Sequence, residues 1–166
     1  MPVVALGTWI VTALAGLFLL AVWLIEYDPG FQRAAATRLP VPVLTAHALL
    51  AVTGLIIWGL YLFADSQRLA ELAAAVLLLV AVLGLTMGAR WVGVYRAHPA
   101  RARAGAGAVQ VAIPPERNFP LPVVIGHGIL AVTTLILVLL TVLKIGVSLP
   151  TGPRQQRPGS SLPLPA

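Results

Sequence analysis

The chain has 166 residues, 59% of them hydrophobic and only 10% charged, with a formal net charge of +6 and no cysteine. Soluble domains carry about 25% charged residues, so this composition excludes an ordinary soluble protein, and the lack of cysteine excludes disulfides, thiolate-bound iron–sulfur clusters and covalent c-type haem. The basic residues lie between apolar segments rather than in one patch with aromatic side chains, which excludes a nucleic-acid-binding role.

Four apolar segments follow one another along the chain, each long enough to cross a bilayer. Residues 3–25 lack the positively charged start of a signal peptide, so we interpret them as a retained membrane helix. The next three segments are residues 41–64, 72–95 and 121–147. We therefore predict an all-α integral membrane protein, with a bundle of four transmembrane helices in residues 1–147 and a Pro-rich tail in residues 148–166.

Each of the two segments that follow the longer loops contains one histidine near its start. The second segment includes "TAHALLAVTG", with His47, and the fourth includes "IGHGILAVTT", in which His127 lies between Gly126 and Gly128. The third histidine, His98, belongs to the basic loop predicted from residue 96 onward. An ionisable side chain within an apolar span marks a functional site by default, so His47 and His127 are the candidate site residues.

The second half of the chain repeats the first. An offset of 80 aligns the fourth segment with the second, and an offset of 68 aligns the third with the first. The informative matches are Pro42 with Pro122, His47 with His127, Ala51 with Ala131, Gly16 with Gly84 and Trp23 with Trp91. We infer a duplicated two-helix unit whose copies are related by an axis along the membrane normal. His47 and His127 then lie at equal depth, about 7 Å beyond the prolines of the first helical turn.

Two imidazoles at one depth on facing helices are a suitable axial ligand pair for a haem iron. The macrocycle needs space beside the ligands, and the neighbouring residues are small: Gly126 and Gly128 in the fourth segment, and Ala51 and Ala131 one turn deeper. Haem propionates need cations, for which Arg90 is the first candidate. The next candidates are Arg38, Arg96 and Arg117.

In these two histidine stretches and in its four-span layout, the chain resembles membrane-embedded b-type cytochromes, such as the cytochrome b561 group and the haem-carrying anchors of succinate dehydrogenase. The resemblance implies one haem b between His47 and His127 as metal ligands. It also implies an electron-transfer subunit of an oxidoreductase complex, with no catalytic residues of its own. The cytochrome b561 group carries two haems on four histidines, whereas two membrane histidines here support one.

Two other classes of function remain open from the sequence. A chlorophyll- or bacteriochlorophyll-binding subunit would use the same histidines and small residues around a magnesium chlorin. A cofactor-free accessory or assembly subunit would use them for helix packing. We interpret the tryptophans and tyrosines near the span ends as anchors at the membrane interface.

The distribution of Lys and Arg predicts the orientation. Seven of them lie on the side of loops 1 and 3 and four on the other side. We expect loops 1 and 3 to be cytoplasmic in a bacterial plasma (inner) membrane. The expected partners are the bilayer, other subunits of a membrane redox complex and a quinone.

Overall fold

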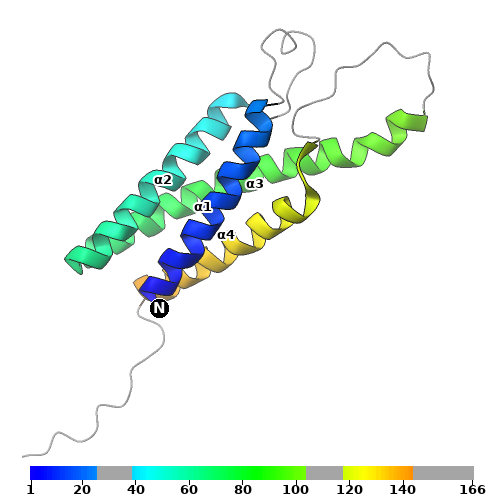
Figure 1. Ribbon diagram of the computed structural model, residues 1–166. Helices are drawn as coiled ribbons and strands as arrows, with labels where there is room; N and C mark the ends of the chain where they lie inside the picture. Colours follow the sequence, from blue (N-terminus) through cyan, green and yellow to red (C-terminus); the bar gives the residue numbers. More distant parts are fainter. Residues whose placement is uncertain (26–38, 104–117, 144–166) are drawn as a thin grey trace, which may run out of the picture.

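The computed structural model describes residues 1–25, 39–103 and 118–143, with only the backbone described at residues 94 and 97–103. Four helices make up this part of the chain (Figure 1). They are α1 (Pro2–Ile25), α2 (Val41–Ala64), α3 (Gln67–Arg103) and α4 (Leu121–Val142). Each is long and apolar enough to cross a membrane. The predicted all-α fold with four helices of membrane-spanning length is confirmed.

Helices α2 and α4 begin in the same way. Pro40 and Pro120 are extended, and the carbonyl of each accepts the first two backbone hydrogen bonds of its helix, at 2.9 and 3.1 Å in both cases. Pro42 and Pro122 lie in the first turn, where the missing N–H would have no intrahelical partner. The predicted role of these prolines as helix starts is confirmed.

Helix α3 is longer than the apolar segment that predicted it. It begins at Gln67, directly after a two-residue link from α2. Asp65 in this link adopts a left-handed conformation (φ 47°), and the carbonyl of Ser66 accepts hydrogen bonds from the N–H groups of Leu69 and Ala70. At its other end the backbone stays helical through Arg103, so His98 lies on a helix rather than in a loop. Alanine and arginine, which dominate this stretch, are good helix formers. The predicted end of the fourth segment, residues 144–147, lies outside the described residues.

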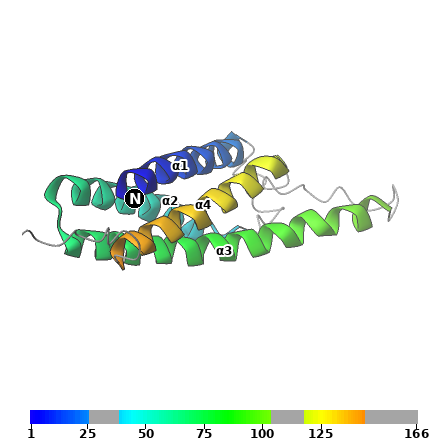
Figure 2. The ribbon, with the colours of Figure 1, turned by 90° about the horizontal axis from the view of Figure 1, so that it is seen from below.

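The four helices form two layers. Helix α2 packs mainly on α3, and α4 mainly on α1, while the smaller contacts α1–α2 and α3–α4 join the layers. The diagonal pairs α1–α3 and α2–α4 do not approach closely, and Figure 2 shows α1 and α3 at opposite edges of the bundle. The space between the layers is therefore lined by side chains from diagonal helices.

The two halves of the chain bury equivalent positions. The buried pairs at the offset of 68 are Ala5 and Ala73, Trp9 and Leu77, Thr12 and Val80, and Trp23 and Trp91. At the offset of 80 they are Gly54 and Thr134, and Trp58 and Val138. Residues aligned by the sequence repeat are thus buried alike in the unit α1–α2 and the unit α3–α4.

The tryptophans are not interface anchors, and that prediction is wrong for all four. Trp9, Trp23, Trp58 and Trp91 are between 0% and 8% exposed, because each side chain points between helices rather than outward. Trp58 donates its indole N–H to the carbonyl of Pro2 (3.2 Å), and its ring centre lies 6.4 Å from that of Trp9. These two rings form the centre of the core at the end of the bundle away from the histidines.

Gly54 makes room for Trp9, so substitutions at Gly54 and at Gly59 of the same helix should differ in their effect on stability. A Cβ at Gly54 would lie 2.8 Å from Cζ2 of Trp9 and 3.1 Å from Val76, whereas a Cβ at Gly59 would meet nothing within 4 Å. We expect Gly54→Ala to lower the free energy of unfolding by about 1–2 kcal/mol through overpacking. Gly59→Ala should leave it unchanged or raise it by up to about 1 kcal/mol.

Titration of the protein from mild detergent into SDS, followed by tryptophan fluorescence and circular dichroism, measures both changes. Equal effects of the two substitutions would contradict the close packing of Trp9 on Gly54.

Candidate cofactor site

The two predicted histidines meet between the layers. His47 comes from α2 and His127 from the diagonal helix α4, and their ring centres are 6.4 Å apart with the ring planes inclined at 65°. Both side chains are partly buried. The rings meet edge-on, although the backbones of α2 and α4 do not approach closely.

Each imidazole is fixed by a hydrogen bond to a neighbouring helix of its own layer. Nδ1 of His47 lies 3.0 Å from the carbonyl oxygen of Val80 in α3, and Nδ1 of His127 lies 3.0 Å from that of Thr12 in α1. A carbonyl oxygen only accepts, so Nδ1 carries the proton in both rings and donates it. The lone pair of each neutral imidazole is then on Nε2.

Neither Nε2 has a hydrogen-bond partner within the described parts of the chain. Two acceptor nitrogens cannot hydrogen-bond to each other. Histidines that bind metals commonly donate their other ring N–H to a backbone carbonyl in this way, which fixes the tautomer and the ring orientation. The arrangement therefore suits an electrophile, such as a metal ion, between the two rings.

A glycine also lies against each imidazole ring. A Cβ at Gly16 would lie 3.0 Å from Cε1 of His127, and one at Gly84 would lie 3.2 Å from Cε1 of His47. Each layer thus contains one unit made of a histidine, a carbonyl and a glycine, with the carbonyl four residues before the glycine. The units are His47, Val80 and Gly84 in one layer, and His127, Thr12 and Gly16 in the other.

Neither these carbonyls nor these glycines were predicted as site residues from the sequence. Gly16 and Gly84 did appear as a matched pair in the repeat. A glycine that is present in both copies of a repeat, within helices of large apolar residues, is the signal that could have identified them.

The small residues that were predicted around the ligands occupy different surroundings. A Cβ at Gly126 or Gly128 would meet nothing within 4 Å, so the space beside His127 on its own helix is open. Ala51 and Ala131 are partly buried, and Ala51 packs against the core. Their role in making room for a macrocycle stays a prediction.

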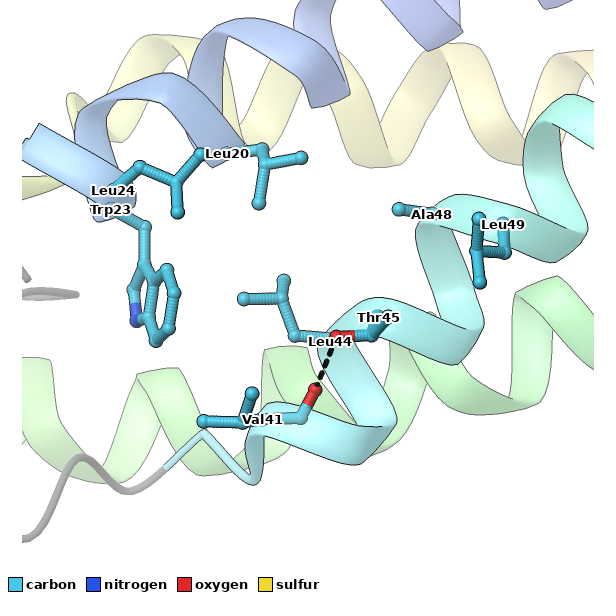
Figure 3. Close-up of a pocket in the computed structure, with 8 residues that line it drawn as sticks. All are labelled: Leu20, Trp23, Leu24, Val41, Leu44, Thr45, Ala48 and Leu49. Carbon is cyan, nitrogen blue, oxygen red and sulfur yellow. Dashed lines mark hydrogen bonds between the residues drawn. The ribbon is translucent and has the colours of Figure 1, made fainter.

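A groove of about 440 Å³ lies between α1 and α2 (Figure 3). Ala48 follows His47 directly, and Leu20 lies one turn after Gly16, which contacts His127. The full lining is Leu20, Trp23, Leu24, Val41, Leu44, Thr45, Ala48 and Leu49. The hydroxyl of Thr45 already donates to the carbonyl of Val41 (2.9 Å, dashed in Figure 3). The lining is mostly apolar, so the groove suits an apolar group, and its volume is in the usual range for a ligand site.

The donor set decides which kind of metal centre fits. Among the described residues, no group of three or more His, Cys, Asp or Glu side chains is placed to hold a metal ion. A bare zinc ion needs four ligands, so two imidazoles suit a metal that brings its other ligands with it, as iron does in a porphyrin.

The spacing of the rings agrees with this. An imidazole nitrogen binds a transition metal at about 2 Å, and the ring centre lies about 1 Å behind that nitrogen, so two rings on opposite sides of one metal have centres about 6 Å apart. The observed 6.4 Å matches this value.

Arg90, the predicted propionate partner, is exposed on α3, six residues beyond Gly84 and so about 9 Å further along the helix. Arg96 is exposed on the same helix. Both lie toward the end of α3 from which loop 3 departs. Arg38 and Arg117 lie outside the described residues.

Compared with protein families, curated proteins and solved structures, the chain matches none of them. Its function is therefore inferred from the chemistry of its own residues.

Proposed function

We propose that the protein is a membrane cytochrome subunit that holds one haem b between His47 and His127 and transfers electrons within a membrane redox complex. The observation that carries this proposal is the pair of imidazoles 6.4 Å apart. Each has its Nδ1 proton donated to a backbone carbonyl at 3.0 Å and its Nε2 left without a partner among the described residues.

When bound, the haem supplies a one-electron iron couple. The residues of the chain do the rest. His47 and His127 would hold the haem, and a haem held by two imidazoles would supply electron transfer rather than oxygen chemistry. The carbonyls of Val80 and Thr12 hold the two rings in the ligating tautomer and increase their basicity. Arg90, exposed on α3, would balance propionate charge at the membrane surface.

We further propose that the four helices span a bacterial plasma membrane with loops 1 and 3 in the cytoplasm, and that the two units arose by duplication. The length and apolar character of the helices support the first statement. The excess of basic residues in loops 1 and 3 supports the orientation. The equivalent burial of repeat-related residues supports duplication. Electron donors and acceptors are then a quinol, a soluble carrier or a neighbouring subunit.

The test is a reduced-minus-oxidised absorption spectrum of the purified protein, combined with a pyridine haemochrome assay. We expect a low-spin b-type spectrum with an α-band on reduction by dithionite and one haem per chain. A far-red chlorin band would instead favour the pigment-binding class. Protein expressed with sufficient haem supply and still lacking any visible chromophore would contradict the proposal and favour an accessory subunit.

A further inference from the structure

Two threonines form a buried hydrogen bond between α1 and α4. The hydroxyl oxygens of Thr12 and Thr134 are 3.3 Å apart, and these residues are 9% and 1% exposed. The hydroxyl of Thr12 donates to the carbonyl of Thr8 (2.7 Å). Since a hydroxyl has one proton to donate, Thr134 is the donor toward Thr12. A polar chain therefore runs from Thr134 through Thr12 to Thr8.

Thr12 also contacts the candidate ligand. Its backbone carbonyl accepts the Nδ1 proton of His127 at 3.0 Å. Thr134 lies seven residues after His127, about two turns along the same face of α4. Helix α4 is thus attached to one residue of α1 at two heights, through the imidazole and through the hydroxyl. The hydroxyl bond between Thr134 and Thr12 fixes the rotation and depth of α4 on α1. The bond from His127 to the carbonyl of Thr12 depends on that position.

The other layer has no such pair. The positions equivalent to Thr12 and Thr134 are Val80 and Gly54, neither of which has a side-chain hydroxyl. There, Nδ1 of His47 bonds to the carbonyl of Val80, and Trp9 fills the space over Gly54. The approximate symmetry of the site is therefore broken by one buried polar contact, on the side of His127 only.

We infer that Thr134, acting through Thr12, is a positioning residue that holds His127 in its hydrogen bond and makes the two axial ligands inequivalent. This inference rests on the proposed haem function. A well-aligned Nδ1–H bond raises the electron donation of an imidazole to its metal, which stabilises ferric over ferrous iron. The hydroxyl pair should therefore strengthen haem retention and lower the midpoint potential.

The experiment compares Thr134→Val, which keeps the shape and removes the hydroxyl, with Thr134→Ser, which restores it. Thr133→Val is the matched control, because Thr133 is exposed and its hydroxyl has one partner within the described residues, the carbonyl of Ile129. For Thr134→Val we expect haem transfer to apomyoglobin to be about 10-fold faster. A 10-fold loss of haem affinity that is confined to the ferric form corresponds to a rise in midpoint potential of about 59 mV for a one-electron couple. Thr134→Ser and Thr133→Val should resemble the wild type.

An unchanged rate and potential in Thr134→Val would overturn the inference. So would an equal change in Thr134→Ser, because the effect would then come from packing. If Thr134→Val does not fold, Thr12→Val removes the same hydroxyl contact while leaving the Thr12 carbonyl in place, and the same changes are expected.

A haem-free measurement separates this inference from the proposed function. If the wild type binds no haem, the proposed function fails. The positioning role is still tested by nitrogen-15 NMR of the imidazoles in the haem-free protein. The inference then requires faster exchange of the His127 Nδ1 proton in Thr134→Val, with the His47 proton unchanged, and equal exchange in variant and wild type would overturn it.

Discussion

Replacement of either His47 or His127 by alanine should abolish the low-spin haem spectrum and reduce the haem content to less than about one tenth of the wild type. Each ring is proposed to supply one axial ligand, and the described part of the chain places no third histidine beside the pair. Changes to groups that merely support a ligand already cost 10- to 100-fold in metal affinity. Loss of the ligand itself should cost at least as much.

Haem content by pyridine haemochrome and the low-spin signal by electron paramagnetic resonance measure this loss. Free imidazole added to either alanine variant should restore part of the low-spin signal, because it can occupy the space left by the removed ring. His98→Ala is the control, and it should bind haem like the wild type. A complete low-spin spectrum in either His47→Ala or His127→Ala would show that the ligand pair is wrong.

Leucine at Gly16 or Gly84 should have the second-largest effect. A Cβ at these positions already lies 3.0 or 3.2 Å from the imidazole of the opposing helix, and a leucine adds three more carbons in the same direction. Neither ring can retreat without giving up its 3.0 Å hydrogen bond to the carbonyl of Thr12 or Val80. We expect haem content to fall at least about 10-fold in each variant, since the ligand and its supporting bond are disturbed together.

The chain offers matched controls on the same two helices. Gly7 on α1 and Gly93 on α3 are exposed, and a Cβ at either would meet nothing within 4 Å. Gly7→Leu and Gly93→Leu should therefore keep their haem. Circular dichroism in detergent should show equal helix content in all four variants. Wild-type haem binding by Gly84→Leu would mean that the ring of His47 is not held against α3.

The repeat makes the asymmetry of this site informative. Equivalent residues are buried at nearly every level of the bundle, yet Trp9 and Gly54 in one set correspond to Leu77 and Thr134 in the other. A site formed by two identical units would present the same surroundings to both faces of a bound macrocycle. The two units instead differ at these positions, and the hydroxyl of Thr134 has no counterpart at Gly54.

Much of the fold followed from the sequence, because the forces that determine it are local. Apolar length alone identifies four helices of membrane-spanning size. The prolines at residues 42 and 122 mark two helix starts, since proline is favoured in the first turn of a helix. Helix ends were less predictable where the helix preference of polar residues extends a helix beyond its apolar segment. The polar and Ala/Arg-rich flanks of the third apolar segment are helical in the structure, and hydropathy could not show this.

The candidate ligands were also accessible from the sequence, because a repeat copies residue identity and depth together. Once His47 aligns with His127 and the two units run in parallel, equal depth follows without any knowledge of packing. The tryptophans were misjudged for the opposite reason. An amphipathic side chain near a helix end suits either the membrane interface or a contact between helices, and only the rotation of the helix distinguishes the two.

The sequence by itself thus determined which residues are imidazoles, where they lie along their helices and how many helices of membrane-spanning length surround them. The tertiary structure decided what each imidazole touches: the carbonyls of Thr12 and Val80, the bare backbone at Gly16 and Gly84, and the hydroxyl pair on one side only. The physical reason is that these contacts join helices far apart in the chain. A backbone carbonyl has the same chemistry at every residue, so its selection as a partner depends on the rotation and spacing of packed helices rather than on sequence.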